Sequence, residues 1–312
     1  MSNEITPRKT LKYDENNLPY IDLGKYKMRL EREEPTNEVL EKARIELRET
    51  PEIVEKAFKE LRELIKQEKH LHLPTEDEYM RMFLRPCKYY PESAMDRIKH
   101  FYNLSLKYGK VCENIVPSTL RHVFEQEIFT LLPVRDQDGR RMIILDVGKK
   151  WKPSKCPLND SFRAVQLAVL SSMAEPTSQI NGNVVIFDMD GLPLANVMQF
   201  TPSFANMLLD YVQDCLCIRL KAVHIVFNSY IFNMLFAIFK PFIKDKLRKR
   251  IFFHGKNMDS LHQHINKECL PAKYGGTLDC ELPPGYLVAD LFEAYKKDFE
   301  MANSYGYTNE LK

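Results

Sequence analysis

Two aspartates separated by one residue are the side chains in this sequence best suited to chemistry. Asp188 and Asp190 follow the apolar run 184–187 and precede Gly191, which gives the pattern D-x-D-G at the end of a predicted strand. With a bound Mg²⁺, the first carboxylate of such a pair can attack phosphorus and the second can move a proton. The pattern therefore raises a first hypothesis, a magnesium-dependent phosphatase that uses Asp188 and Asp190.

The D-x-D-G pattern resembles the first motif of haloacid-dehalogenase-like phosphatases, but its surroundings differ from theirs. Leu192 stands where that family prefers Thr or Val, and the motif lies late in the chain for that fold. Asp210 and Asp214 lie within a helical pattern, and the next predicted strand ends without a carboxylate. Because Mg²⁺ needs several converging oxygen ligands, we favour a structural role, in which both aspartates accept hydrogen bonds from turn amides.

Other candidate catalytic or metal-binding residues are weaker. The pairs His70/His72 and His262/His264 each lack an obvious third ligand, and the seven cysteines form no C-x-x-C pair that would bind zinc. The sequence contains no G-x-S-x-G, G-x-x-x-x-G-K-[ST] or G-x-G-x-x-G pattern. We therefore predict no catalytic residue, no metal site and no cofactor.

Composition and charge narrow the class of protein. The 312 residues are 44% hydrophobic and 28% charged, which is typical of a folded globular chain. The net charge of +2 provides no overall basic field, so a nucleic-acid partner is not expected. The N-terminal residues lack the apolar region of a secretory signal, and polar residues and a proline interrupt the greasiest stretch, 224–243. These features favour a cytoplasmic protein without a membrane-spanning helix.

The first third of the chain is predicted to be helical. Helical periodicity covers 36–67, 78–84 and 91–108, which predicts a small all-helical N-terminal domain over residues 36–112. The preceding residues, 1–35, are polar and lack periodicity, and we expect them to form a flexible N-terminal arm.

Beyond residue 112, apolar runs alternate with helical stretches. Strands are predicted at 140–147, 183–189 and 222–227, and helices at 161–174, 204–215 and 231–239. Continuous apolar strands indicate a sheet that is covered on both faces. The alternation predicts an α/β domain with a largely parallel sheet over residues 113–280, followed by a C-terminal helix and tail at 281–312.

Two neighbouring segments favour a function at membranes. Helical spacing places Phe232, Phe236 and Phe239 along one stripe of a helix that is apolar nearly all round. Periodicity alone leaves two interpretations open, a central core helix or a lid over a hydrophobic cavity. Five basic residues then crowd into positions 244–250, a pattern that is common on solvated turns but that an anionic membrane surface would also attract.

Several motifs together resemble the CRAL-TRIO lipid-binding domain family. They are, in chain order, FLR at 83–85 with YYPESA at 89–94, EPTSQING at 175–182, VIFDMDG at 185–191, FTP at 200–202, KAVH at 221–224, KPF at 240–242, HG at 254–255 and LPAKYGG at 270–276. Within the family, the sequence is most similar to the branch of α-tocopherol transfer proteins and clavesins. The segment ELRETP at 46–51 is similar to arthropod members of that branch.

This resemblance implies a fold and a pocket. The small helical domain would precede an α/β CRAL-TRIO domain whose largely parallel sheet floors a deep apolar pocket. The region 231–243 would form a mobile gate, with Phe232, Phe236 and Phe239 as lid residues, and the D-x-D-G pattern would be a structural element. The pocket-lining candidates are Phe129, Phe162, Val165, Gln166, Val169, Phe187, Leu208, Val212, Ile218, Leu220 and Val223.

The resemblance also implies contacts with phosphoinositide head groups. Arg219, Lys246 and Arg250 occupy positions that are basic in the tocopherol carrier of this family. Its fourth basic position is Cys87 in this sequence, and the adjacent Lys88 is the candidate for that contact. Val165 and Gln166 also differ from the smaller residues of that carrier, so tocopherol is only one candidate ligand beside retinoids, carotenoids and other lipids.

The predicted function is intracellular binding and transfer of a small hydrophobic ligand, with docking on phosphoinositide-containing membranes. The expected partners are the ligand and an anionic membrane surface, and we expect a cytoplasmic protein that associates peripherally with membranes. A lipid-sensing membrane adaptor without net transfer is the alternative. The sequence leaves the oligomeric state open, and a monomer is the simplest expectation.

Overall fold

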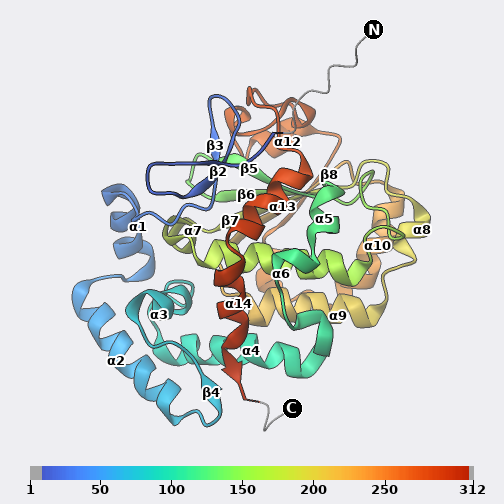
Figure 1. Cartoon of the computed structure of the whole chain (residues 1–312). Coiled ribbons are helices and arrows are strands. Elements are labelled where there is room, and N and C mark those ends of the chain that lie inside the picture. Colours follow the sequence, from blue (N-terminus) through green and yellow to red (C-terminus); the bar gives the residue numbers. More distant parts are fainter. Residues whose placement is uncertain (1–8, 309–312) are drawn as a thin grey trace.

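A five-stranded sheet lies at the centre of the computed structural model, which describes residues 9–308 (Figure 1). The strands follow the order β5 (Phe129–Arg135), β6 (Arg141–Asp146), β7 (Asn183–Asp188), β8 (Leu220–Val226) and β9 (Ile251–Gly255). β5 pairs antiparallel with β6, and the remaining pairs are parallel. The predicted α/β fold with a largely parallel sheet is thus confirmed.

Both faces of the sheet are buried, as the continuous apolar runs predict. Successive side chains point to opposite faces, so Met142 and Val184 pack with Leu261 and Leu270 on one side. Val185 and the odd-numbered residues paired with it on the adjacent strands face the other side of the sheet, where α6 and α9 lie. In Figure 1, α6 and α9 lie below the sheet, α12 lies above it, and α8 and α10 lie at one end.

The helices of this domain separate the strands along the chain. Their bounds are α5 (Arg121–Glu125), α6 (Leu158–Met173), α7 (Pro176–Asn181), α8 (Leu194–Val197), α9 (Pro202–Asp210) with a π-helical turn (Tyr211–Cys215), α10 (Tyr230–Phe239), α11 (Asp245–Arg248) and α12 (Met258–His262). Within residues 9–308, no helix has the length and apolarity needed to cross a membrane.

The helical N-terminal part contains α1 (Asn37–Leu47), α2 (Pro51–Gln67), α3 (Asp77–Leu84) and α4 (Pro91–Tyr108). Thr50 caps α2 through a hydrogen bond to the Ile53 amide, and Pro51 occupies the first turn, where its missing N–H costs nothing. Buried Arg85 joins this part to the sheet domain. Its guanidinium contacts the Glu49 carboxylate at 2.9 Å and donates to Gln179 Oε1 at 2.7 Å.

Residues 9–35 form an ordered layer, which corrects the prediction of a flexible arm for this part of the chain; residues 1–8 lie outside the described residues. Strands β1 (Lys12–Tyr13), β2 (Pro19–Asp22) and β3 (Lys27–Met28) pair antiparallel. Ile21, Met28 and Leu30 are buried in the core that contains β5 and α13. These few apolar residues are too widely spaced to produce a periodic pattern.

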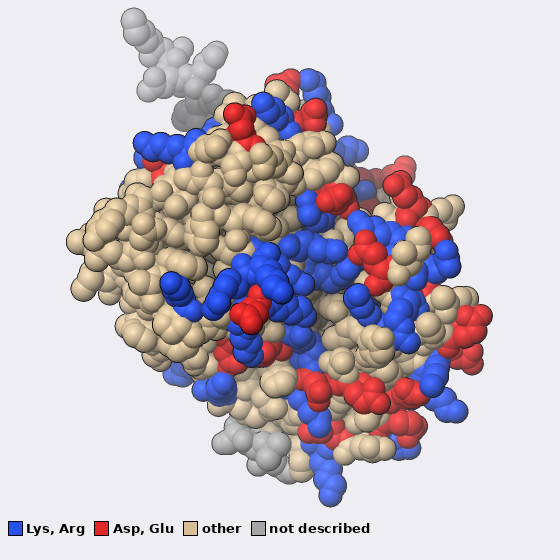
Figure 2. All heavy atoms as spheres, turned by 180° about the vertical axis from the view of Figure 1, so that it is seen from behind, with Lys and Arg blue, Asp and Glu red and all other residues tan. Residues whose placement is uncertain are grey.

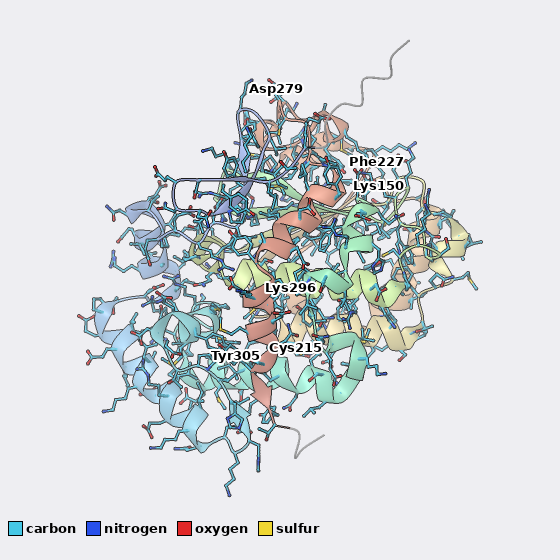
Figure 3. The ribbon with its side chains drawn as sticks, in the orientation of Figure 1. Lys150, Cys215, Phe227, Asp279, Lys296 and Tyr305 are labelled. Atoms are coloured by element: carbon cyan, nitrogen blue, oxygen red, sulfur yellow. The ribbon has the colours of Figure 1, made fainter. Side chains whose placement is uncertain are left out.

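The C-terminal segment is also more than one helix and a tail. Helices α13 (Gly285–Ala294) and α14 (Lys296–Ser304) precede β10 (Gly306–Tyr307), which pairs with β4 (Leu71–His72) of the helical part. Phe292 of α13 lies 4.9 Å from the Phe124 ring, so α13 shares the core of the sheet domain. At the far end of α14, the Tyr305 ring (Figure 3) packs against Tyr79 at 5.3 Å.

Candidate lipid-binding site

An apolar cavity of about 280 Å³ lies between the sheet and the helices α6, α9 and α10. Strand alternation places Ile143, Val185 and Val223 on its floor. On α6, Phe162, Val165 and Val169 line it at steps of three and four residues, the spacing of one helical face. The cavity therefore follows directly from the apolar periodicity of the strands and of α6.

The structure places every predicted pocket residue except Gln166 on the wall of this cavity. Gln166 follows Val165 on α6, and consecutive helical residues point about 100° apart. Its side chain faces a second cavity, of about 400 Å³, and its Nε2 donates to the Val111 carbonyl at 2.9 Å. We therefore remove Gln166 from the set of ligand-contact candidates.

Helix α10 forms one wall of the cavity through Phe232, Phe236 and Phe239. The Phe236 ring packs edge-on against Phe253 at 5.1 Å, and the Phe239 ring packs against Phe200 at 5.8 Å. The opposite face of the helix is open to solvent. Helix α10 therefore has one face on the cavity and one exposed face, which differs from the burial expected for a central core helix.

The outer face of α10 and the neighbouring segments α8 and β9 carry a group of exposed apolar side chains. Tyr230 is 78% exposed and Met234 is 42% exposed on α10, and Met198, just after α8, is 73% exposed. Leu194 and Phe253 are exposed as well. On the side of the molecule that carries α8 and α10, Figure 2 shows a broad surface without Lys, Arg, Asp or Glu, and basic side chains gather beside it.

Lys246 and the three cations that act on it, Lys88, Arg97 and Arg250, form what we call the basic cluster. Burial lowers the pKa of Lys246, and the nearby positive charges of Arg250, Arg97 and Lys88 lower it further. Within the described part of the chain, no carboxylate forms an ion pair with any of the four. Arg97 donates to the backbone carbonyls of Gln213 and Asp214, and Arg250 donates to that of Leu220. The cluster is therefore a local excess of positive charge.

Arg219, the remaining head-group candidate, differs from the basic cluster. It lies close enough to Arg250 to lower the pKa of that guanidinium, an effect second to burial. Its own charge is balanced by Glu46, whose carboxylate lies 2.8 Å away, and the Arg219 side chain is only 13% exposed. Arg219 also donates to the Ile180 carbonyl. It therefore joins β8 to α1 and α7 and is not available as a free cation.

Asp188 and Asp190 lie at the end of β7, outside the cavity. Asp188 is fully buried, accepts from the Asp190 amide at 3.0 Å and from the Tyr274 hydroxyl at 2.9 Å, and pairs with Lys273. Both of its carboxylate oxygens thus have partners within the fold. Lys149 hydrogen-bonds to Asp190 and lowers the pKa of that carboxyl. No group of three metal-ligating side chains occurs in residues 9–308.

Sequence reasoning missed the residues with polar groups on the cavity wall, Trp151, Ser161, Asn183 and Tyr211. Asn183 begins a strand whose next residues are apolar, and its polarity is the signal that could have identified it. Tyr211 begins the π-helical turn after α9, where the change of helical period alters which residues face inward. A pattern based on 3.6 residues per turn does not extend through such a turn.

Comparison with known proteins finds relatives that are similar to most of this chain. "Alpha-tocopherol transfer protein-like" from Mus musculus is 33% identical over 243 residues, which are 78% of this chain and 71% of that protein. Clavesin-1 from Pongo abelii is 31% identical over 276 residues, 87% of this chain and 76% of that protein. The solved structure of Sfh5 covers 86% of this chain and 100% of its own, at a TM-score of 0.48 and 13% identity.

The relatives named here are mammalian, so the likeness of residues 46–51 to arthropod proteins stays a prediction. The model of a protein family described as the CRAL/TRIO domain matches residues 125–276, from the end of α5 to the segment that binds Asp188. With the two relatives above 30% identity, this match shows that the chain belongs to the CRAL/TRIO domain family.

Proposed function

We propose that this protein binds a small hydrophobic molecule in the cavity and carries it between membranes. The observation that carries the proposal is the apolar cavity closed by α10, whose outer face is itself apolar and exposed. Burial of the ligand would supply affinity at about 0.8 kcal/mol per CH₂ group. Tocopherols, retinoids and carotenoids are the candidate ligands, and the names of the tocopherol-transfer relatives support this class.

Membrane contact would open the lid. The exposed side chains of Tyr230 and Met234 would enter the boundary between head groups and acyl chains, where burial of apolar surface is favourable. The basic cluster lies beside this surface and would be attracted to anionic lipid, at about 1 kcal/mol for each Lys or Arg. Phosphoinositides suit the cluster because they concentrate several negative charges in one head group. Lys246, Arg250 and Lys88 are the proposed contacts.

A vesicle transfer assay tests both parts of this proposal. Donor vesicles would carry a fluorescent tocopherol analogue, and acceptor vesicles would contain or lack a phosphoinositide. We expect faster transfer to the phosphoinositide vesicles. Replacing Lys246→Ala together with Arg250→Ala should weaken binding to these vesicles roughly 30-fold, from two charges at about 1 kcal/mol each, and should leave transfer to neutral vesicles unchanged.

The matched control removes two positive charges elsewhere. Lys59→Ala with Lys66→Ala changes exposed residues of α2 and should leave both rates unchanged. If both double variants behave alike, the basic cluster is not the docking site. If the protein sediments with vesicles but moves no probe, it is a lipid-sensing adaptor and the transfer proposal is wrong.

A further inference from the structure

Two cavities lie on either side of one aromatic side chain. The apolar cavity of about 280 Å³ is bounded by α10, and the second cavity, of about 400 Å³, lies between α4, α6 and residues 302–308. Among the described residues, Tyr211 is the one that lines both cavities. Its side chain is only 1% exposed. Tyr211 therefore occupies the space between the two cavities.

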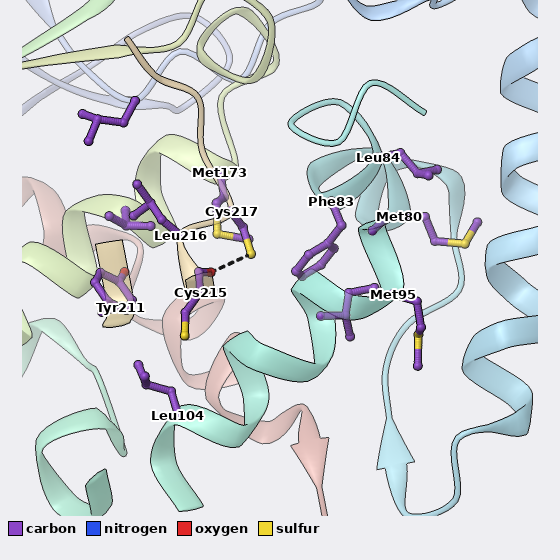
Figure 4. Packing of buried hydrophobic residues seen from close by; sticks show 14 of the residues in the cluster. Met80, Phe83, Leu84, Met95, Leu104, Met173, Tyr211, Cys215, Leu216 and Cys217 are labelled. Carbon is purple, nitrogen blue, oxygen red and sulfur yellow. Dashed lines mark hydrogen bonds between the residues drawn. The ribbon is translucent and has the colours of Figure 1, made fainter. Parts of the chain in front are cut away.

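The contacts of Tyr211 agree with this position. Its ring packs edge-on against Phe162 at 5.3 Å, and Phe162 lines only the apolar cavity. Its hydroxyl lies near Cys112, which lines only the second cavity. In the view of Figure 4, Tyr211 lies between Leu216, from the wall of the apolar cavity, and Leu104, from the wall of the second cavity. Tyr211 thus has neighbours on the walls of both cavities.

The backbone that carries Tyr211 is held from two sides. Tyr211 begins a π-helical turn, and Arg97 of α4 donates to the Gln213 carbonyl of this turn at 3.2 Å. The Gln213 side chain donates to the Phe242 carbonyl at 3.1 Å and accepts from the Lys244 amide at 2.7 Å. Such turns are rare, and many of them occur at functional sites. This turn fixes Tyr211 between the helical N-terminal part and the segment that follows α10.

The apolar cavity is small for a lipid chain. A methylene group occupies about the volume of a water molecule, roughly 30 Å³, so the cavity holds roughly nine such groups. The second cavity has room for roughly thirteen more. The rings of Phe101, Tyr102 and Tyr305 on its wall provide contacts for an apolar chain. A chain longer than the apolar cavity has to displace either the lid or Tyr211.

We infer that Tyr211 is a partition that divides one long binding channel and thereby limits the length of the ligand that the protein binds well. The inference rests on the proposed function and adds a residue that determines its specificity. Each methylene group within the apolar cavity gains affinity by leaving water. Each group beyond the limit gains less, because close-packed side chains have to move to admit it. Without the Tyr211 ring, the two cavities would join.

A series of straight-chain alcohols tests this inference. Hexan-1-ol to octadecan-1-ol would displace the neutral fluorophore N-phenyl-1-naphthylamine from the delipidated native protein and from Tyr211→Ala. In the native protein, we expect Kd to fall about four-fold for each added CH₂ group up to roughly nine carbons, and to level off beyond that length. In Tyr211→Ala, the fall should continue for about eight further carbons. The Kd ratio between the two proteins is compared at each chain length, so that differences in solubility between the alcohols cancel.

Two control variants separate the partition from cavity size and from the hydroxyl. Phe204 of α9 lines only the apolar cavity, so Phe204→Ala enlarges that cavity without joining it to the second one. The length limit should then increase by roughly three carbons, the volume of the lost ring. Tyr211→Phe keeps the ring and should keep the native limit.

The possible outcomes distinguish the inference from the proposed function. The same length limit in the native protein and Tyr211→Ala would overturn the inference, as would equal increases in Tyr211→Ala and Phe204→Ala. If the native protein binds neither the fluorophore nor any alcohol, the proposed function is wrong instead. The loss of a buried ring destabilises the fold. If Tyr211→Ala does not fold, Tyr211→Leu decides the question, and an unchanged limit in that variant would overturn the inference.

Discussion

Asp188 shows how a residue type that suggests catalysis can serve the fold. Its carboxylate binds a tyrosine and a lysine from the segment LPAKYGG, more than 80 residues later in the chain. A buried carboxylate is tolerated only when donors surround it, and here they come from Tyr274, Lys273 and the Asp190 amide. The two family motifs are therefore the two halves of one structural contact.

Histidines provide the clearest pH dependence at the scale of single residues. His224 of β8 and His254 of β9 lie side by side, with Nδ1 and Nε2 2.9 Å apart. Burial, and then the neighbouring histidines His254 and His264, lower the pKa of His224 to about 3. Burial, and then His264, lower the pKa of His254 to about 4. The ordinary value is 6.5, so the unfolded chain takes up protons first as the pH falls.

The free energy of unfolding should therefore be highest above pH 6.5 and decrease progressively towards pH 3. The decrease is about 1.4 kcal/mol for each unit by which the pKa of His224 in the folded chain lies below its ordinary value. His224→Phe removes the titrating group and should flatten this decline, because a phenyl ring can keep the stacking on Phe252. Urea unfolding at several pH values between 7.5 and 4.5 measures the effect. Parallel declines in the native protein and the variant would contradict this explanation.

At the scale of elements, α10 is the helix on which the mechanism depends. Its inner aromatic residues line the cavity and its outer residues face solvent. In the proposed mechanism, opening of this helix would exchange protein contacts for lipid contacts. The segment that follows continues into α11 and carries two members of the basic cluster at Lys246 and Arg250. The proposal thereby assigns membrane attraction and lid opening to one continuous stretch of chain.

Removing the exposed apolar side chains of the lid should weaken membrane binding without weakening the fold. Tyr230→Ser with Met234→Ser should reduce vesicle affinity at least ten-fold, because a fully buried apolar side chain contributes about 1.5–3 kcal/mol. The melting temperature should stay within about 2 °C of the native value, since surface changes of this kind are usually within ±0.5 kcal/mol.

The matched control for the lid replaces the same residue types elsewhere on the surface. Tyr13 is 55% exposed and Met301 is 54% exposed, and neither lies near α10 in sequence. Tyr13→Ser with Met301→Ser should leave vesicle affinity unchanged. Equal affinities for the two double variants, measured by sedimentation, would refute insertion of the lid.

At the scale of the whole molecule, the elements with strong periodicity were predictable and the others were not. The bounds of α4, Pro91–Tyr108, agree with the prediction from the sequence. Strand β5 was missed because Pro133 lies within it, and its antiparallel pairing at the sheet edge tolerates that residue. The ordered N-terminal layer was missed because its stability comes from long-range contacts, such as that between the Glu31 amide and the Glu175 carboxylate.

The site shows the same division between local patterns and long-range contacts. The family resemblance predicted the residues that line the cavity, and the alternation in the strands and the periodicity of α6 agree with that lining. Gln166 is the exception, because it follows Val165 on α6 and its side chain points to the second cavity. Which of the basic residues are paired with carboxylates could not be predicted from the sequence. Only the folded chain brings Glu46 to Arg219 and leaves Lys246 without an ion-pair partner among residues 9–308.

The central claim is that the cavity holds a hydrophobic molecule, and mass spectrometry of the intact protein under native conditions tests it most directly. The account predicts that the purified protein carries an apolar species, or takes one up from a mixture of tocopherols, retinoids, carotenoids, sterols and phospholipids. Val223→Trp, which fills the cavity with an indole ring, should abolish that added mass. The bare mass of the chain after exposure to every one of these ligands would contradict the account.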